Sequence, residues 1–281
     1  MKIDINPSVD NYCVMGNPVA HSKSPQIHTA FAEQTQHNIF YQAIHIDDGK
    51  FIAALKEFQA QGGKGLNITV PFKGDAWEIS ENRSNRSERA LAVNTISFDD
   101  AGKITGDNTD GVGLIRDLTI NHDISIKDKD ILILGAGGAV RGILDPLFDK
   151  EVGRITIANR TVNRAEELAD MFSDRGDIST CGFDELAGSG FDIIINGTSA
   201  SLQGEVPPLP ENLLNDNACC YDMMYSMSDT PFVSWAKAQG ATKASDGLGM
   251  LVEQAAESFF IWRGVRPETR QVIDAVRKDA R

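Results

Sequence analysis

The stretch that decides the fold is DILILGAGGA, residues 130–139. Its first half, Asp130 to Leu134, is an apolar run of the kind that forms a strand buried on both faces of a parallel sheet. A glycine-rich turn follows at once, and a helical pattern begins behind it. The turn consists of Gly135, Ala136, Gly137, Gly138 and Ala139. A strand, a glycine turn and a helix in this order predict a dinucleotide site. The reason is that glycines let the backbone approach a pyrophosphate, which the free N–H groups of the helix start can bind.

The turn departs from the usual GxGxxG pattern at one position. Val140 stands where glycine or alanine is usual. Its larger side chain predicts a slightly wider spacing between the helix and the sheet. A tight turn that binds no ligand is the alternative interpretation.

The chain beyond this turn alternates between helical and strand-like segments. Pro146 should bend or shorten the first of these helices. The alternation predicts a doubly wound parallel sheet of the Rossmann type. The expected helices are 139–150, 163–171, 231–239 and 249–262, and the expected strands are 154–158, 191–195 and 218–221.

The end of the second strand indicates which dinucleotide binds. NAD sites place a carboxylate there to bond the ribose hydroxyl, whereas this chain has Asn159, Arg160 and Thr161. The planar guanidinium of Arg160 can cover a 2′-phosphate, and Arg164 lies one turn into the next helix. The sequence therefore predicts NADP rather than NAD. A solvated surface role for Arg160 is the alternative.

The first hundred residues have a different pattern. Strands are expected over 12–15, 40–46 and 65–70, helices over 26–35 and 51–61, and a hairpin over 92–105. We predict a two-domain α/β protein. Residues 1–109 would form a substrate-binding domain, and residues 110–244 a Rossmann domain that binds NADP.

The candidate catalytic and substrate-binding residues lie in the first predicted domain. Ser22 and Ser24 precede a helix, where hydroxyls and free N–H groups can receive a carboxylate. Ser24 is also expected to be the N-cap of that helix, with Pro25 at its first position. A plain capping role for Ser24 is the alternative.

A second cluster follows the strand at 65–70. Asn67 and Thr69 share one face of that strand, which a purely apolar core would not favour. Lys73 follows the turn, Asn94 lies within an apolar strand, and Asp110 is expected at the boundary between the two predicted domains. Lys73 and Asp110 form a plausible acid–base unit, in which the carboxylate positions the ammonium. A solvated Lys73 is the alternative.

Composition excludes several classes of protein. The 281 residues carry a net charge of −13, from 40 acidic and 27 basic side chains, which argues against a nucleic-acid partner. No apolar run is long enough to span a membrane, and the N-terminus lacks the pattern of a secretory signal. The five histidines are scattered and the four cysteines form no CxxC pair, so we expect no metal and a cytoplasmic location.

Taken together, these motifs resemble those of the shikimate dehydrogenase family. The matching segments span nearly the whole chain in order: 14–18, 21–25, 67–73, 92–95, 108–113, 135–139, 159–161, 222–225 and 246–255. The resemblance implies reversible NADPH-dependent reduction of 3-dehydroshikimate to shikimate, on the pathway to chorismate and aromatic amino acids. A quinate/shikimate dehydrogenase that also accepts NAD, and a dinucleotide sensor without activity, are the alternatives.

The resemblance implies that residues 245–281 form C-terminal helices that pack back on the substrate domain, because Gln254 is expected to reach the substrate. It also implies a role for each matching residue. Lys73 and Asp110 would be the acid–base pair, and Ser22 and Ser24, assisted by Tyr225, would hold the substrate carboxylate. The substrate hydroxyls would be bound by Asn67, Thr69, Asn94, Asp110 and Gln254. The cofactor would be bound by residues 135–139 and by Asn159, Arg160, Thr161, Arg164, Thr198, Met223 and Gly247. Ser201 stands where the family often has glycine, which leaves the shape of its loop open. We expect a monomer or a homodimer.

Overall fold

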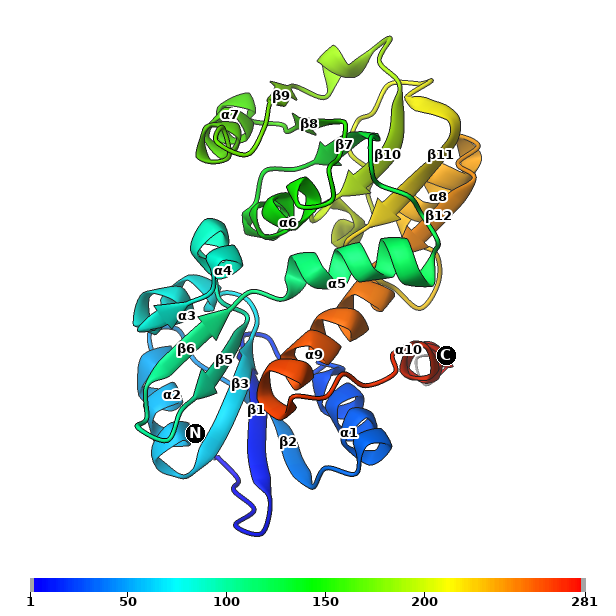
Figure 1. Cartoon of the computed structure of the whole chain (residues 1–281). Coiled ribbons are helices and arrows are strands. Elements are labelled where there is room, and N and C mark those ends of the chain that lie inside the picture. The colour runs from blue at the N-terminus through cyan, green and yellow to red at the C-terminus, as the bar shows by residue number, and fades with distance from the viewer. Residues whose placement is uncertain (1–2, 279–281) are drawn as a thin grey trace. The chain divides into compact units, whose positions relative to one another are not determined.

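The computed structural model describes residues 3–278 and divides into two compact units (Figure 1). One unit holds residues 3–113 and 252–278, and the other holds residues 114–251. The chain leaves the first unit within α5 (Asp110–Arg116) and returns to it within α9 (Leu248–Arg263). Each unit has its own six-stranded sheet.

The sheet of the first unit is mixed, with the strand order β2-β1-β3-β5-β6-β4. Strands β2, β1 and β3 run parallel, whereas β5 runs antiparallel to both of its neighbours. The strands are β1 (Asp10–Gly16), β2 (Ile39–His45), β3 (Gly63–Ile68), β4 (Asn82–Arg83), β5 (Thr95–Phe98) and β6 (Ile104–Asp107). The helices, besides α9, are α1 (Ser24–Thr35), α2 (Phe51–Ala60), α3 (Lys73–Ile79), α4 (Asn85–Ala90) and α10 (Arg270–Lys278).

Strand β1 is buried on both faces, which places it at the centre of the first unit. Cys13 and Met15 face one apolar cluster, which includes residues of α2 and α3. Tyr12 and Val14 face the opposite cluster, against which Trp262 of α9 packs. Alternate residues of one strand therefore hold helices on both sides of the sheet.

The sheet of the second unit is parallel throughout, with the strand order β9-β8-β7-β10-β11-β12. Counted from β7, this is the order 3-2-1-4-5-6 of a Rossmann fold, so the predicted fold class is confirmed. The strands are β7 (Asp130–Leu134), β8 (Arg154–Ala158), β9 (Ile178–Cys181), β10 (Phe191–Asn196), β11 (Leu214–Asp222) and β12 (Lys243–Asp246). The helices are α6 (Gly138–Phe148), α7 (Val162–Met171) and α8 (Pro231–Ala238), with short helical turns η1 (Asp117–Asn121), η2 (Asp184–Leu186) and η3 (Ala200–Gln203).

The apolar run that predicted β7 is buried on both sides, as expected. Ile131 and Ile133 lie in one core cluster, and Leu132 and Leu134 lie in the other. All four side chains have no exposed surface. The glycine turn is thereby fixed to a strand at the centre of its sheet.

Some elements differ from the sequence predictions. Helix α6 ends at Phe148, two residues earlier than expected, with Pro146 inside its last turn. The chain from Asp110 to Asn121 is helical but divides into α5 and the π-helical turn η1. Strands β9 and β12 were not predicted, because their sequences, ISTC and KASD, carry little apolar signal. They lie at the two edges of the parallel sheet, where backbone pairing with one neighbour defines a strand.

Candidate functional site

The glycine turn lies at the switch point of the second sheet. Strand β7 has β8 on one side and β10 on the other. The strand order therefore changes direction between β7 and β10. In open α/β sheets, ligands bind beyond the carboxyl ends of the strands at such a point. The turn after Leu134 therefore has the position of a dinucleotide site.

The geometry of this turn fits a pyrophosphate. Gly135 has a φ of +100°, and a Cβ there would lie 3.2 Å from the Thr198 Cγ2 atom. Gly137 is the N-cap of α6, and both it and Gly138 are exposed. A Cβ on either of these two glycines would meet no other atom of the described chain within 4 Å. The first N–H groups of α6 therefore border open space, where an anion would also be favoured by the helix dipole.

Val140, the departure from the fingerprint, is completely buried. A Cβ added to Gly197 would lie 2.4 Å from the Val140 Cγ2 atom. The extra volume of the valine is therefore accommodated by a glycine at the end of β10. The two positions are 57 residues apart, so the sequence pattern around either one does not reveal the contact.

The residues after β8 present unpaired positive charge. Arg160, Thr161 and Arg164 are exposed, and the Asn159 Nδ2 donates to the Thr161 carbonyl at 2.8 Å. No carboxylate of residues 3–278 forms an ion pair with Arg160 or Arg164. Both guanidinium groups are thus available to a phosphate.

The remaining residues expected near the cofactor follow the ends of β10, β11 and β12. The Asn196 Oδ1 accepts hydrogen bonds from the Thr198 amide at 3.1 Å and from its hydroxyl at 2.7 Å. Gly247 packs directly on Met223, since a Cβ there would lie 2.4 Å from the Met223 carbonyl oxygen. Tyr225, which was expected to assist in holding the substrate carboxylate, also follows the end of β11 and is 37% exposed. Burial and the nearby Asp246 carboxylate raise its pKa.

The loop around Ser201 has a defined anchor. Ser201 lies in η3, and its hydroxyl donates to the Asp222 Oδ2 at 2.6 Å. The Asp222 carboxylate is fully buried and also accepts from the Asn196 Nδ2 at 3.0 Å and the Thr230 hydroxyl at 2.6 Å. The serine that replaces the family's glycine thus fixes its loop to the end of β11.

In the first unit, Lys73 and Asp110 are in direct contact. The Lys73 Nζ lies 2.6 Å from the Asp110 Oδ2, and the Asn94 Nδ2 donates to the Asp110 Oδ1 at 2.8 Å. The lysine is the first residue of α3 and the aspartate is the first residue of α5. The Lys73 side chain is 29% exposed and that of Asp110 is 15% exposed, so the pair is reachable from solvent. A held ammonium at a partly open site can exchange a proton with a bound oxygen.

Gln254 belongs to the same group of contacts, because it is bonded to Asn94, which is bonded to Asp110. Its Oε1 accepts from the Asn94 Nδ2 at 3.3 Å and from the Thr109 hydroxyl at 3.2 Å. Thr109 and Ser258 were not predicted to take part. Ser258 could have been found from its spacing, because it lies four residues after Gln254 and hence on the same face of α9.

Asn67 is held by protein groups on both sides of its amide. Its Nδ2 donates to the Asn94 carbonyl at 3.2 Å and to the Ser258 hydroxyl at 3.0 Å. Because a carbonyl only accepts, the Asn67 Oδ1 must face the Tyr41 hydroxyl, at 2.7 Å, and the His28 Nε2, at 3.1 Å. His28 therefore carries its proton on Nε2, and its buried Nδ1 has no partner in the described chain.

His28 makes the stability of the first unit depend on pH. Burial lowers its pKa from 6.5 to about 3, against the opposing effect of the hydrogen bond to Asn67. The unfolded chain takes up this proton below pH 6.5, whereas the folded chain does not until about pH 3. Within this window we expect the histidine to lower the free energy of unfolding by about 1.4 kcal/mol for each unit of falling pH.

Urea unfolding of the wild type and of His28→Gln between pH 7 and pH 4 measures this slope. In His28→Gln, the free energy of unfolding should fall less steeply as the pH falls, because the contribution of the histidine is absent. Tyr41→Phe is the matched control, because it removes the other hydrogen bond to the Asn67 Oδ1 and retains the histidine. Equal slopes in the wild type and His28→Gln would contradict the assignment.

The segment with the two serines differs from the prediction in one respect. Ser24 is not the N-cap of α1: Lys23 occupies the cap position, and Ser24 is already the first helical residue. Its backbone is helical, so its hydroxyl cannot reach back over the first turn as a cap does. The Ser22 hydroxyl instead accepts from the Ser24 amide at 3.3 Å, and Ser24 is 7% exposed. Thr69 follows the end of β3, with its amide bonded to the Met15 carbonyl at 3.0 Å.

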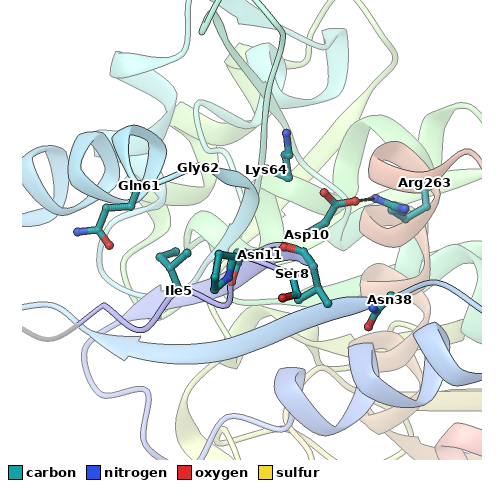
Figure 2. Close-up of a pocket in the computed structure, with 11 residues that line it drawn as sticks. Ile5, Ser8, Asp10, Asn11, Asn38, Gln61, Gly62, Lys64 and Arg263 are labelled. Atoms are coloured by element: carbon teal, nitrogen blue, oxygen red, sulfur yellow. Dashed lines mark hydrogen bonds and ion pairs between the residues drawn. The ribbon is translucent and has the colours of Figure 1, made fainter.

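A pocket of about 630 Å³ lies at the opposite end of the same sheet (Figure 2). It is bordered by residues at the amino ends of β1, β2 and β3, such as Asp10, Asn38 and Lys64, together with Arg263. None of the predicted site residues lines it. The predicted residues follow the carboxyl ends of β1 and β3, so the two places are distinct.

Residues 3–278 contain no group of three or more His, Cys, Asp or Glu side chains placed to hold a metal ion. In the same range, no helix combines the length and the apolar character needed to cross a membrane.

A Rossmann sheet with a glycine turn at its switch point, in one chain with an α/β unit that holds a lysine–aspartate pair, defines a dinucleotide-dependent dehydrogenase of two domains. Comparison with known families narrows this class. A model described as "Shikimate dehydrogenase substrate binding domain" matches residues 14–96, and "Shikimate / quinate 5-dehydrogenase" matches residues 118–203. "Shikimate 5'-dehydrogenase C-terminal domain" matches residues 247–277.

Individual relatives agree. A protein of Alkalilimnicola ehrlichii named shikimate dehydrogenase (NADP(+)) is 57% identical over 270 residues, covering 96% of this chain and 99% of that protein. The crystal structure of an Ael1 enzyme from Pseudomonas putida superposes with a TM-score of 0.89 at 44% identity, covering 95% of this chain and 97% of the other. A Thermus thermophilus shikimate 5-dehydrogenase in complex with NADP(H) and shikimate gives 0.85 at 29% identity, covering 97% and 100%. The chain belongs to the shikimate dehydrogenase family.

Proposed function

We propose that this protein catalyses the reversible NADPH-dependent reduction of 3-dehydroshikimate to shikimate, on the route to chorismate and the aromatic amino acids. The observation that carries the proposal is the 2.6 Å contact between Lys73 and Asp110 within a cluster of amides and hydroxyls. Such groups suit an anionic polyol, and the family membership supports the same substrate.

Lys73 is the acid–base group of this proposal. In the reductive direction its ammonium donates a proton to the ketone oxygen while the carbonyl carbon receives hydride. Asp110 holds the ammonium in place, and Asn94 holds the other oxygen of that carboxylate. In the oxidative direction the lysine takes the hydroxyl proton back.

The other predicted residues bind the substrate. Ser22 and Ser24 receive its carboxylate, with Tyr225 assisting. Its hydroxyls are bound by Asn67, Thr69, Asn94, Asp110 and Gln254. A substrate hydroxyl at Asn67 must share or replace one of the four contacts described above, since both sides of that amide are already engaged.

The second unit is proposed to bind the cofactor, which supplies the hydride. Residues 135–139 hold the pyrophosphate, and Asn159, Arg160, Thr161 and Arg164 hold the 2′-phosphate end. Met223 and Gly247 contact the nicotinamide, and Thr198 lies near the cofactor. The open space before Gly137 and Gly138 and the unpaired guanidinium groups support this fit.

A steady-state assay tests the function directly. The wild-type protein is given shikimate or quinate with NADP or NAD, and the absorbance of the reduced cofactor is followed. We expect shikimate with NADP to give the highest kcat/KM. A similar kcat/KM for quinate with NAD would instead favour the dual-cofactor enzyme. The residues Asn159, Arg160 and Thr161 argue against that alternative. No turnover with any pair would exclude both enzymes.

We further infer a cytoplasmic protein with reduced thiols, either monomeric or homodimeric. All four cysteines are free, and burial raises the pKa of Cys220 to about 12, which keeps that thiol protonated. Light scattering of the purified protein would determine the oligomeric state.

A further inference from the structure

Arg86 bridges two carboxylates in the first unit. Its Nε donates to the Asp107 Oδ1 at 2.7 Å, and its Nη2 donates to the Asp107 Oδ2 at 2.8 Å. The same Nη2 lies 3.0 Å from the Glu257 Oε1. The three side chains are 23%, 17% and 11% exposed, so these charges are screened less than surface pairs are.

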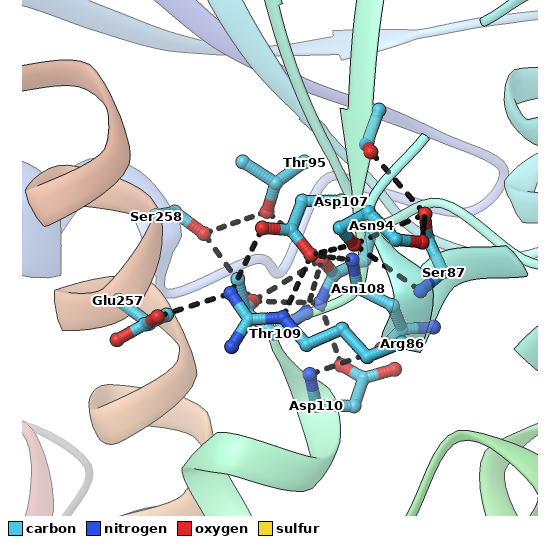
Figure 3. A network of polar contacts seen from close by, with 12 residues as sticks. Arg86, Ser87, Asn94, Thr95, Asp107, Asn108, Thr109, Asp110, Glu257 and Ser258 are labelled. Atoms are coloured by element: carbon cyan, nitrogen blue, oxygen red, sulfur yellow. Dashed lines mark hydrogen bonds and ion pairs between the residues drawn. The ribbon is translucent and has the colours of Figure 1, made fainter. Parts of the chain in front are cut away.

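The two carboxylates belong to the segments that carry proposed site residues (Figure 3). Asp107 is the last residue of β6, three residues before Asp110. Glu257 lies three residues after Gln254, one turn further along the same face of α9. The guanidinium therefore joins the strand that leads into Asp110 to the helix that carries Gln254.

The Asp107 carboxylate also shapes the backbone that leads to Asp110. Its Oδ1 accepts from the Asn108 amide at 2.7 Å, and the Asn108 Oδ1 in turn accepts from the Asp110 amide at 3.1 Å. The path from Arg86 to the acid–base pair thus consists of consecutive hydrogen bonds. A shift of Asp107 would be transmitted to the start of α5.

We propose that Arg86 is a positioning residue for the acid–base pair: by clamping Asp107 to Glu257, it sets the separation of Asp110 and Gln254. The proposal rests on the proposed function. It assigns to α4, which contributes no proposed substrate ligand, a role in the rate of the reaction. Misplacement of a reacting group by about 1 Å can cost a factor of about 100 in rate.

The chain should remain folded without this arginine. Asp107 would keep the Ser84 hydroxyl and the Asn108 amide, and Glu257 would keep its contact with Arg266. The clamp can therefore be tested by substitution.

The test compares Arg86→Met and Arg86→Lys with Arg175→Met. Arg175 is a matched control: it also bridges two carboxylates, Asp145 at 2.7 Å and Asp149 at 2.5 Å, and its side chain is 26% exposed, but it lies in the second unit. kcat and both KM values are measured for shikimate and NADP, together with the unfolding temperature of each variant.

We expect Arg86→Met to lower kcat/KM for shikimate by about 30-fold, with the KM for NADP unchanged. Arg86→Lys should recover part of the loss, because it restores the charge and not the two-pronged geometry. Arg175→Met should lower the unfolding temperature and leave the kinetic constants within about twofold.

Two results would overturn the clamp: Arg86→Met as active as the wild type, or Arg175→Met as inactive as Arg86→Met. If Arg86→Met does not fold, Glu257→Met takes its place, because it removes the acceptor of the hydrogen bond from the Arg86 Nη2 and leaves Asp107 paired. Unchanged kinetics of Glu257→Met would then also overturn the clamp. A wild-type protein without turnover would show instead that the proposed function is wrong.

Discussion

Lys73→Met should lower kcat for shikimate oxidation by about 1,000-fold, which corresponds to about 4 kcal/mol of lost transition-state stabilisation. The substitution keeps most of the side-chain length and removes the group that exchanges the proton. The Asp110 carboxylate would retain its hydrogen bond from Asn94, so the site should keep its shape. The measurement is kcat at saturating shikimate and NADP.

Lys56→Met is the matched control for this substitution. Lys56 is exposed on α2 in the same unit, and its side chain makes no hydrogen bond or ion pair within the described residues. Its kcat should equal that of the wild type. A loss of less than about tenfold in Lys73→Met would show that the lysine is not the acid–base group.

Arg160→Ala should reduce the preference for NADP over NAD by about 100-fold, the equivalent of about 3 kcal/mol for the charged hydrogen bonds to a phosphate. The effect should fall on the KM for NADP, since the 2′-phosphate is remote from the reacting carbon and is bound equally in the ground and transition states. The KM for NAD should change little. The ratio of kcat/KM with the two cofactors measures the preference.

Arg154→Ala provides the comparison on the same strand. Arg154 begins β8 and pairs with Asp130 at 2.5 Å, whereas Arg160 follows the other end of β8. Removing Arg154 should leave the preference unchanged. If Arg160→Ala kept the full preference, another group would have to select the phosphate, and the assignment of Arg160 would be abandoned.

The sequence was most informative for features that depend only on the chemistry of neighbouring residues in the chain. The apolar run 131–134 required burial on both faces, and the glycines after it required a turn that few other residues can form. The residues after β8 indicated a phosphate because charge and hydrogen-bonding capacity belong to the side chains themselves. The polar residues in apolar strands identified Asn67 and Asn94 as unusual, since burying an amide costs free energy unless it is hydrogen-bonded.

Other features depend on contacts that only the tertiary structure decided. Val140 is tolerated because Gly197 leaves room for it, and Ser201 is anchored because Asp222 ends the neighbouring strand. The tautomer of His28 follows from an amide 39 residues away.

The same distinction applies to the site itself. The sequence by itself determined a Rossmann unit with a glycine-rich turn after its first strand and the types of residue available for catalysis. Tertiary structure decided which of them meet: Lys73 with Asp110, and Arg86 with both Asp107 and Glu257. The physical reason is that propensity and charge are properties of short segments, whereas hydrogen bonds between distant segments depend on how the whole unit packs.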